Sequence, residues 1–149
     1  MEISGTISAI VRDKGGAVHC ISPDATVYDA IETMANRNIG ALLVLSGQRL
    51  VGVISERDYT RKIALKGKQS KQTPVSEIMF SPVISVSEDA SVEECMELMT
   101  QHRIRHLPVL DGDRVVGVVS IGDLINWIIK TQREVLNSME DFISGKYPG

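Results

Sequence analysis

"VVGVVSIGDL" (residues 115–124) and "LVGVISERDY" (residues 50–59) are near-copies, and this repeated stretch decides how the rest of the chain is read. In both, a serine follows the glycine after three places, and an aspartate follows the serine after three more. The copies belong to a longer duplication. When the chain is laid over itself, residues 18–58 align without a gap with residues 83–123, and roughly 18 of 41 positions are identical. Two copies are too few for a solenoid, so we expect a closed pair that shares one core.

Each copy predicts the element order β-α-β-β-α. Short β-type runs at residues 18–22 and 83–87 each lead into an amphipathic helix, which in the second copy starts with a capping box at Ser91. Two apolar runs then flank the turn sequence "SGQ" or "DGD", as in a β-hairpin. A second helix is predicted to begin near Ser55 and near Ser120. The fold class is therefore α/β (α+β).

The chain divides into four predicted segments. The first repeat, with an N-terminal segment, covers residues 1–65, and the polar stretch 66–74 is a linker. The second repeat covers residues 75–130, and residues 131–149 form a C-terminal helical tail.

Apolar residues recur three or four places apart after Asp123, with Gln132 interrupting the pattern, which predicts one long helix with an apolar stripe. The stripe consists of Ile125, Ile128, Val135, Met139 and Phe142. It could pack on its own module or form a dimer contact, and the sequence leaves both possibilities open.

Composition and charge narrow the function classes. The chain has 149 residues, of which 43% are apolar, and a net charge of -3, which is an ordinary soluble balance and argues against a general nucleic-acid surface. No apolar run approaches the roughly 20 residues that cross a membrane, and we expect no signal peptide. Cys20 and Cys95 lie in unrelated contexts, so we interpret both as core thiols and expect a cytoplasmic protein.

The repeated serine and aspartate allow two interpretations. The pattern S-x-x-D can simply cap a helix, because the serine accepts from a free N–H and the aspartate favours the positive helix end. The same groups can also form a binding site, in which the helix start takes an anion and the aspartate accepts hydrogen bonds from a vicinal diol. Gly52 and Gly117 interrupt β-branched strands, which often marks the close approach of another group. An anion beside a diol is typical of a ribose phosphate.

Positive charge gathers near these stretches in a chain that is acidic overall. The segment "QHRIRHLPV" (residues 101–109) carries four basic residues before the second hairpin, and Arg57 and Arg61 share one helix face in the first copy. These residues could be a solvated surface, or they could bind phosphate, for which the arginine fork is well suited.

With these features the chain resembles a pair of CBS domains, the cystathionine β-synthase repeat or Bateman module, of the stand-alone bacterial type. The resemblance covers roughly residues 8–130 and rests on the doubled element order, on "SPDATVYDAIETM" and "SEDASVEECMELM", and on "GVISERD" and "GVVSIGD". It implies two repeats related by a pseudo-twofold axis, with their sheets back to back and two clefts between them. The resemblance also implies an adenosine ligand (AMP, ADP, ATP, NAD or S-adenosylmethionine) and a homodimer.

Site residues follow from the resemblance position by position. In the cleft of the second repeat, Asp123 would bind the ribose, Ser120 the phosphate, Val118 the base, and Arg105 and His106 the phosphate. The other repeat would enclose the base there with Gly16, Ala17, Val18, His19, Ile39, Gly40 and Ala41. In the cleft of the first repeat the residues would be Val53, Ser55, Arg57, Asp58, Arg61, Ile84 and Ile104. Gly40 and Ala41 stand where the second copy has Arg105 and His106, so a phosphate in the first cleft would need Arg57, Arg61 or Lys62 instead. We therefore expect AMP in the second cleft and leave the first to another or larger adenosyl ligand such as NAD.

No catalytic or metal site is predicted. The sequence has no nucleophile-elbow motif, no Walker lysine pattern and no zinc-ligand spacing. We therefore expect a regulatory module that senses an adenine nucleotide (AMP most of all) and signals to a separate effector protein. The alternatives are a dimerisation scaffold with empty clefts and, with less support, a nucleotide-processing enzyme.

Overall fold

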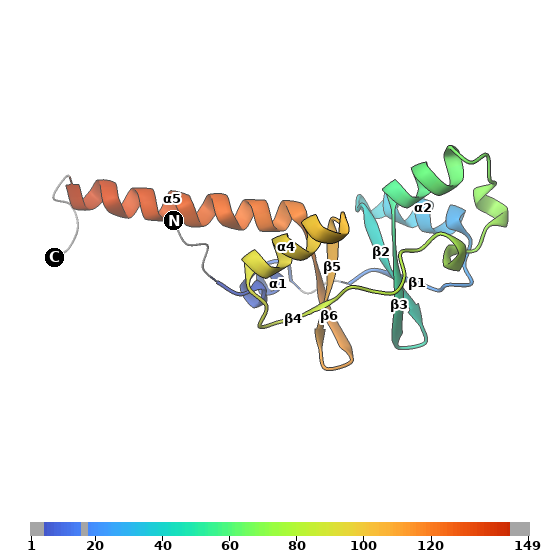
Figure 1. The fold of residues 1–149 in the computed structure, drawn as a ribbon, viewed down its shortest axis with the longest axis horizontal. Helices are drawn as coiled ribbons and strands as arrows, with labels where there is room; N and C mark the ends of the chain where they lie inside the picture. The colour runs from blue at the N-terminus through green and yellow to red at the C-terminus, as the bar shows by residue number, and fades with distance from the viewer. Residues whose placement is uncertain (1–4, 16–17, 144–149) are drawn as a thin grey trace.

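Two three-stranded sheets of identical topology form the centre of the molecule (Figure 1). The structure is a computed structural model and describes residues 5–15 and 18–143. In each sheet a short strand pairs in parallel with the first strand of a hairpin, whose two strands are antiparallel. The strands of the first sheet are β1 (Cys20–Ile21), β2 (Ala41–Ser46) and β3 (Arg49–Ser55). Those of the second are β4 (Val86–Ser87), β5 (His106–Asp111) and β6 (Arg114–Ser120). The α/β class and the doubled order predicted from the sequence are confirmed.

The duplication extends to the pairing register. Ala41 lies opposite Ser55 in the first hairpin, and His106 lies opposite Ser120 in the second. Both hairpins turn at a glycine with positive φ, Gly47 at 65° and Gly112 at 63°, a conformation that other residues rarely adopt. The two serines therefore end their strands at equivalent places in the two repeats.

The predicted helices are present. Each first helix begins with a hydroxyl cap: the side chain of Thr26 accepts from the Asp29 amide before α2 (Val27–Arg37), and that of Ser91 accepts from the Glu94 amide before α4 (Val92–His102). The second helix differs between the repeats. In the first it is α3 (Glu56–Tyr59), continued by a π-helical turn, Thr60–Ala64, and in the second it is α5 (Ile121–Ile143).

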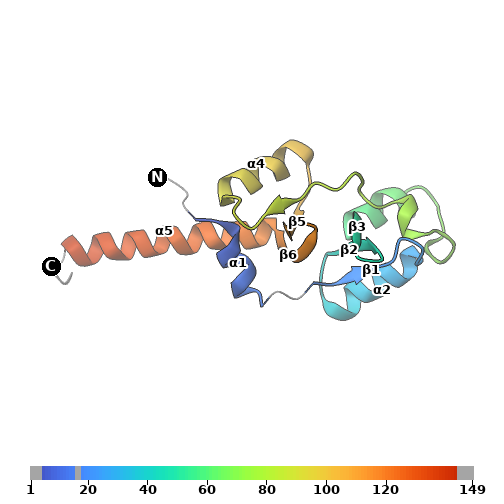
Figure 2. The same cartoon turned by 90° about the horizontal axis from the view of Figure 1, so that it is seen from below.

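A helix that the sequence periodicity did not predict, α1 (Ile7–Asp13), packs on the second repeat although it precedes the first. Figure 2 shows α1 beside α5. The segment that precedes the second repeat, in contrast, packs on the first. The leading residues in the second core are Ile7, Ile10 and Val11, and those in the first core are Val75 and Ile78. Each repeat thus contributes residues to the core of the other. The two hydrophobic cores therefore do not coincide with the two predicted sequence segments, whose boundaries remain a prediction.

Equivalent backbone hydrogen bonds fix this exchange. The Ile7 amide donates to the Ala90 carbonyl at 3.0 Å, and the Val75 amide donates to the Ala25 carbonyl at 2.8 Å. Ala25 and Ala90 occupy the same position of the two repeats, so the two contacts are copies of each other.

The strand glycines serve the same exchange. A Cβ at Gly52 would lie 2.5 Å from the Met79 sulfur, and a Cβ at Gly117 would lie 2.8 Å from Val11 Cγ1. The expected close approach is therefore real, but side chains of the exchanged segments make it, and a bulkier strand residue would push them out.

The tail helix begins inside the second core and then leaves it. Leu124 is fully buried, and Trp127 and Ile128 pack against the core. Farther along, Leu136 and Met139 are 59% and 55% exposed, and Figure 1 shows this part of α5 extending away from both sheets. Packing of the stripe on its own module therefore accounts only for the start of α5. The side chain of Phe142 lies outside the described residues.

One expectation about the cysteines is wrong. Cys95 is a buried core thiol, whose pKa is raised to about 11 by burial and then by the charge of Glu94. Cys20 is exposed, because β1 is a two-residue strand at the edge of its sheet and the Cys20 side chain does not face the core. Among the described helices, none combines the length and the apolar character needed to cross a membrane.

Candidate functional site

A cavity of about 510 Å³ lies between the two repeats, at the end of β3. The first repeat contributes the end of β3, α3 and the π-helical turn, and the second contributes the loop before β5 together with the segment that leads into β4. The lining residues are Gly40, Val53, Ser55, Glu56, Arg57, Asp58, Arg61, Lys62, Phe80, Ile84, Arg103, Ile104, Arg105 and His106.

One wall of this cavity is apolar and anchored. Val53 and Phe80 exchange two backbone hydrogen bonds, of 3.2 and 2.8 Å, so the crossing segment is joined to the sheet edge. Ile84 and Ile104 of the second repeat complete the wall. An apolar wall of this kind suits an aromatic base.

Ser55 and Asp58 are capping residues and cavity residues at once. The Asp58 Oδ2 atom accepts from the Ser55 amide and from its hydroxyl, both at 3.0 Å, and the Asp58 amide donates to Ser55 Oγ at 3.3 Å. The other carboxylate oxygen lies 3.5 Å from Lys62 Nζ. The capping interpretation is therefore confirmed here, and the capped carboxylate also lines the cavity; its binding of a ribose stays a prediction.

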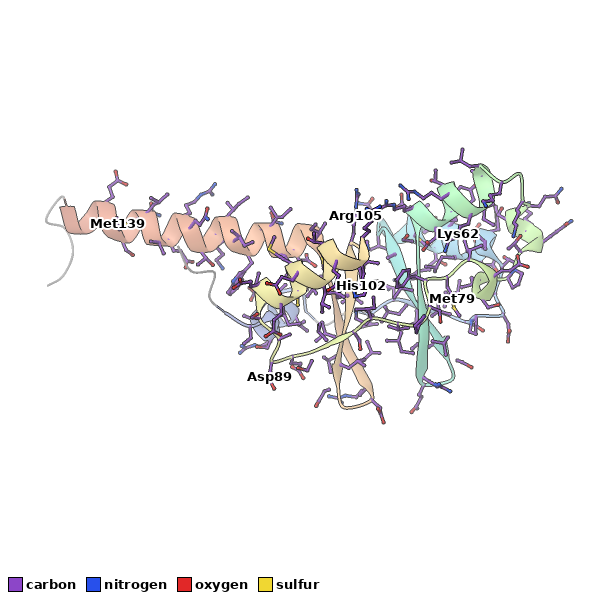
Figure 3. All side chains as sticks on the ribbon, viewed as in Figure 1. Lys62, Met79, Asp89, His102, Arg105 and Met139 are labelled. Carbon is purple, nitrogen blue, oxygen red and sulfur yellow. The ribbon has the colours of Figure 1, made fainter. Side chains whose placement is uncertain are left out.

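The cavity has an excess of positive charge. Five arginine and lysine side chains and one histidine line it, against two acidic side chains, Glu56 and Asp58. Figure 3 shows Arg105 and Lys62, one from each repeat, on the same side of the molecule. The basic residues are Arg57, Arg61, Lys62, Arg103, Arg105 and His106. Positive groups that converge from two elements favour a ligand with several negative charges.

His106 lies between this cavity and the second repeat's aspartate. Burial lowers its pKa, the charges of Lys14 and Arg105 lower it further, and the charge of Asp123 opposes them. His106 is thus held neutral while it faces the cavity, where it can donate one hydrogen bond or take up a proton.

Several cations of this cavity have no counterpart at the equivalent position of the other repeat. In the alignment of the two repeats, Arg57 and Arg61 correspond to Gly122 and Asn126, and Arg105 corresponds to Gly40. The internal symmetry of the fold therefore does not extend to these charged positions.

The second aspartate is already paired. Asp123 Oδ2 accepts from Lys14 Nζ at 2.7 Å and from the Ser120 amide at 2.8 Å, and Lys14 Nζ also donates to the Val118 carbonyl at 2.8 Å. Burial alone would raise the pKa of Asp123, but the hydrogen bonds from Lys14 and Ser120 and the charge of Lys14 outweigh it and lower that pKa. This lysine was not anticipated, because it is 109 residues from its partner and no local pattern marks it.

The structure distributes the predicted site residues unevenly. All seven residues predicted for the first cleft line the cavity. Gly40, Arg105 and His106 were assigned to the second cleft but line this first one. The loop before β5 and the start of β5 face the end of β3, where the Gly40 carbonyl accepts from the Glu56 amide at 3.1 Å. Val18, His19, Ile39, Ala41, Val118, Ser120 and Asp123 do not line it, and Gly16 and Ala17 lie outside the described residues. The second cleft as a ligand site stays a prediction.

Three lining residues were absent from the predicted site, Glu56, Phe80 and Arg103, and Lys62 had been considered only as an alternative to Arg57 and Arg61 for the phosphate. Lys62 lies one helical turn after Asp58, and Arg103 belongs to the basic segment, so both had a sequence signal. Phe80 had none, because it reaches the cavity only through the segment exchange.

Comparison with known proteins agrees with this architecture. The family model described as "CBS domain" matches residues 8–65 and 75–130. The mitochondrial CBS domain-containing protein CBSX3 of Arabidopsis thaliana is 41% identical over 160 aligned positions, which cover 99% of this chain and 78% of the relative. CBS domain-containing protein YhcV of Bacillus subtilis is 37% identical, with 72% and 76% of the two chains covered.

A solved structure leads to the same family. It is that of a protein with CBS domains from Burkholderia ambifaria, whose name refers to signal transduction. That protein is 46% identical, superposes with a TM-score of 0.82, and the match covers 86% of this chain and 96% of the other. The chain belongs to the CBS domain family and carries two CBS domains in tandem.

Proposed function

We propose that this tandem CBS module binds an adenine nucleotide with two or more phosphates, such as ADP, ATP or NAD, in the cleft of the first repeat. Tandem CBS modules are generally regulatory and nucleotide-binding, and stand-alone ones are generally not enzymes. The observation that carries the finer proposal is the cavity with an apolar wall, one capped carboxylate and six basic side chains. The preference for AMP in the second cleft has less support, because the cations are in the first.

The proposed contacts use each part of the cavity once. The base lies against Val53 and Ile104, and the free lone pairs of Asp58 accept from the ribose hydroxyls. Arg57 from the first repeat and Arg105 from the second bind the phosphates. Because both repeats hold one ligand, binding favours the arrangement in which they are closest, and this change of population is the signal.

Isothermal titration with AMP, ADP, ATP, NAD and S-adenosylmethionine tests the proposal. We expect Asp58→Asn to weaken binding of the best ligand at least tenfold, with the helix cap kept by the isosteric amide. Arg105→Ala should weaken ADP at least tenfold and adenosine less than threefold, whereas Arg114→Ala, at an exposed hairpin position, should change neither.

Two results would overturn this assignment. Equal losses of ADP and adenosine in Arg105→Ala would remove the arginine from the phosphates. Absence of binding by any of the five ligands would leave a dimerisation scaffold as the better description.

We further propose that the signal passes to a separate effector protein and that the chain forms a homodimer through α5. CBS proteins often form oligomers, and Ile125, Ile129 and Leu136 lie exposed along this helix. A cytoplasmic location also remains a prediction, and the Arabidopsis relative is named as mitochondrial.

A further inference from the structure

The contacts of Lys14 distinguish the second repeat from the first. Its ammonium bridges Asp123 Oδ2, at 2.7 Å, and the Val118 carbonyl, at 2.8 Å. Lys14 directly follows α1, so it belongs to the segment that crosses from the second repeat back to the first. The lysine therefore reaches the second repeat from outside that repeat's own sequence.

The groups that Lys14 holds are the equivalents of two cavity residues. In the alignment of the repeats, Val118 corresponds to Val53 and Asp123 to Asp58, and both Val53 and Asp58 line the first cavity. Among the described residues, Asp58 pairs only with Ser55 and Lys62, which belong to its own strand end and helix. A ligand can thus approach Asp58 without breaking a contact between the repeats.

We infer that Lys14 is an internal plug, which occupies the aspartate of the predicted second cleft and confines nucleotide binding to the first cleft. The ammonium sits on the carboxylate that a ribose would need, and a ligand in the second cleft would have to displace it. The Lys14 side chain is 41% exposed and that of Asp123 22%, so the contact can open without unfolding the core. The inference uses the ligand class of the proposed function, but its test does not depend on the first cleft.

Four proteins separate the two statements: the wild type, Asp58→Asn, Lys14→Met, and the double variant Asp58→Asn/Lys14→Met. Each is titrated with ADP and, separately, with AMP. We expect one bound nucleotide per chain in the wild type and two in Lys14→Met. The double variant should bind one nucleotide per chain, and its Kd should be at least tenfold lower than the Kd of Asp58→Asn. Lys68→Met, which removes another exposed lysine from an ion pair, should behave as the wild type. Lys14→Arg retains the cation and should keep the second cleft closed.

The double variant decides the inference. If it binds neither AMP nor ADP more tightly than Asp58→Asn, while its circular dichroism matches the wild type, Lys14 is only a structural residue. If the wild type binds nothing but the double variant binds one nucleotide, the plug stands and the proposed function of the first cleft fails. If Lys14→Met does not fold, Asp123→Asn replaces it in the same comparison. This variant frees Lys14 but also removes the carboxylate that a ribose would need, so it should raise the affinity for AMP no more than threefold.

Discussion

Arg103 shows how one residue can serve the cavity at the expense of the backbone. It ends α4 in the left-handed region at a φ of 55°, where its equivalent in the first repeat is Asn38 at the same φ. Asparagine tolerates this conformation better than arginine does. The arginine lines the cationic cavity, so its position costs stability and adds positive charge to the cavity.

We therefore expect Arg103→Asn to stabilise the fold and weaken the ligand. Unfolding in urea should show a gain of about 0.5–1 kcal/mol, and titration should show a Kd for ADP at least threefold higher. Arg37→Asn, within α2 and outside the cavity, is the matched control and should not change ADP binding. A variant that loses stability and keeps its affinity would contradict this exchange.

The protonation of His106 should couple nucleotide binding to pH. The free protein holds the His106 pKa below its ordinary value, mainly through burial, so the ring is neutral near pH 7. A phosphate in the cavity favours the imidazolium and raises that pKa, and binding then takes up a proton and strengthens as the pH falls through the His106 pKa of the complex. Titrations in buffers of different ionisation enthalpy measure the uptake.

His106→Gln is the control for this linkage, because ADP itself titrates in the same range. The slope of log Kd against pH is measured for both proteins. The difference between the two slopes is the contribution of His106 to the proton uptake. Equal slopes in the two proteins would show that His106 does not bind the phosphates.

At the scale of elements, the local patterns were informative where the contacts are local. Both first helices start at their predicted hydroxyl caps, and both hairpins turn at their predicted glycines. The missed elements are short. In α1 the buried residues Ile7, Ile10 and Val11 do fall at helical spacing, but a helix of two turns is too short for periodicity to decide. The π-helical turn at residues 60–64 departs from the α-helical period, so a search for that period does not detect it.

The exposed face of α5 predicts the oligomeric state. Ile129 and Leu136 are 46% and 59% exposed and lie two helical turns apart, so they face the same way along the helix. We expect Ile129→Glu/Leu136→Glu to convert a dimer into a monomer, with a dimer Kd at least 100-fold higher, as measured by sedimentation or light scattering. Burial of each such side chain is worth about 1.5–3 kcal/mol.

A matched pair of charge changes on the same helix, Lys130→Glu/Arg133→Glu, should leave the dimer intact. Nucleotide binding should survive both double variants, because no described residue of the tail lines the cavity. A wild type that is monomeric at micromolar concentration would refute the dimer, and the exposed stripe would then need another partner.

At the scale of the whole molecule, the duplication was predictable, but the way in which it closes was not. The two copies can be aligned from the sequence because both repeats keep the same core positions. That α1 packs on the second repeat, and that residues 75–79 pack on the first, depends on contacts across the chain. The same contacts bring Phe80 into the cavity and Lys14 onto Asp123. The site residues inside the aligned repeats could therefore be predicted, whereas those in the exchanged leading segments could not.

Exchanged leading segments should make the two repeats unfold as one unit. Ile7 and Val75 are both fully buried, each in the core of the repeat that its own sequence does not belong to. Ile7→Ala should lower the free energy of unfolding by about 2–5 kcal/mol, and Val75→Ala should lower it by less, since it removes fewer carbons.

Trp127 is the single tryptophan and packs on the second core, so its fluorescence reports that repeat. Val75→Ala acts on the first core, but it should lower the urea midpoint of Trp127 fluorescence as much as that of circular dichroism. Leu65→Ala, at a residue that is 78% exposed, should move neither midpoint. If Val75→Ala shifts the circular dichroism and leaves the tryptophan transition where it was, the repeats are independent folding units, and the exchange has no cooperative effect.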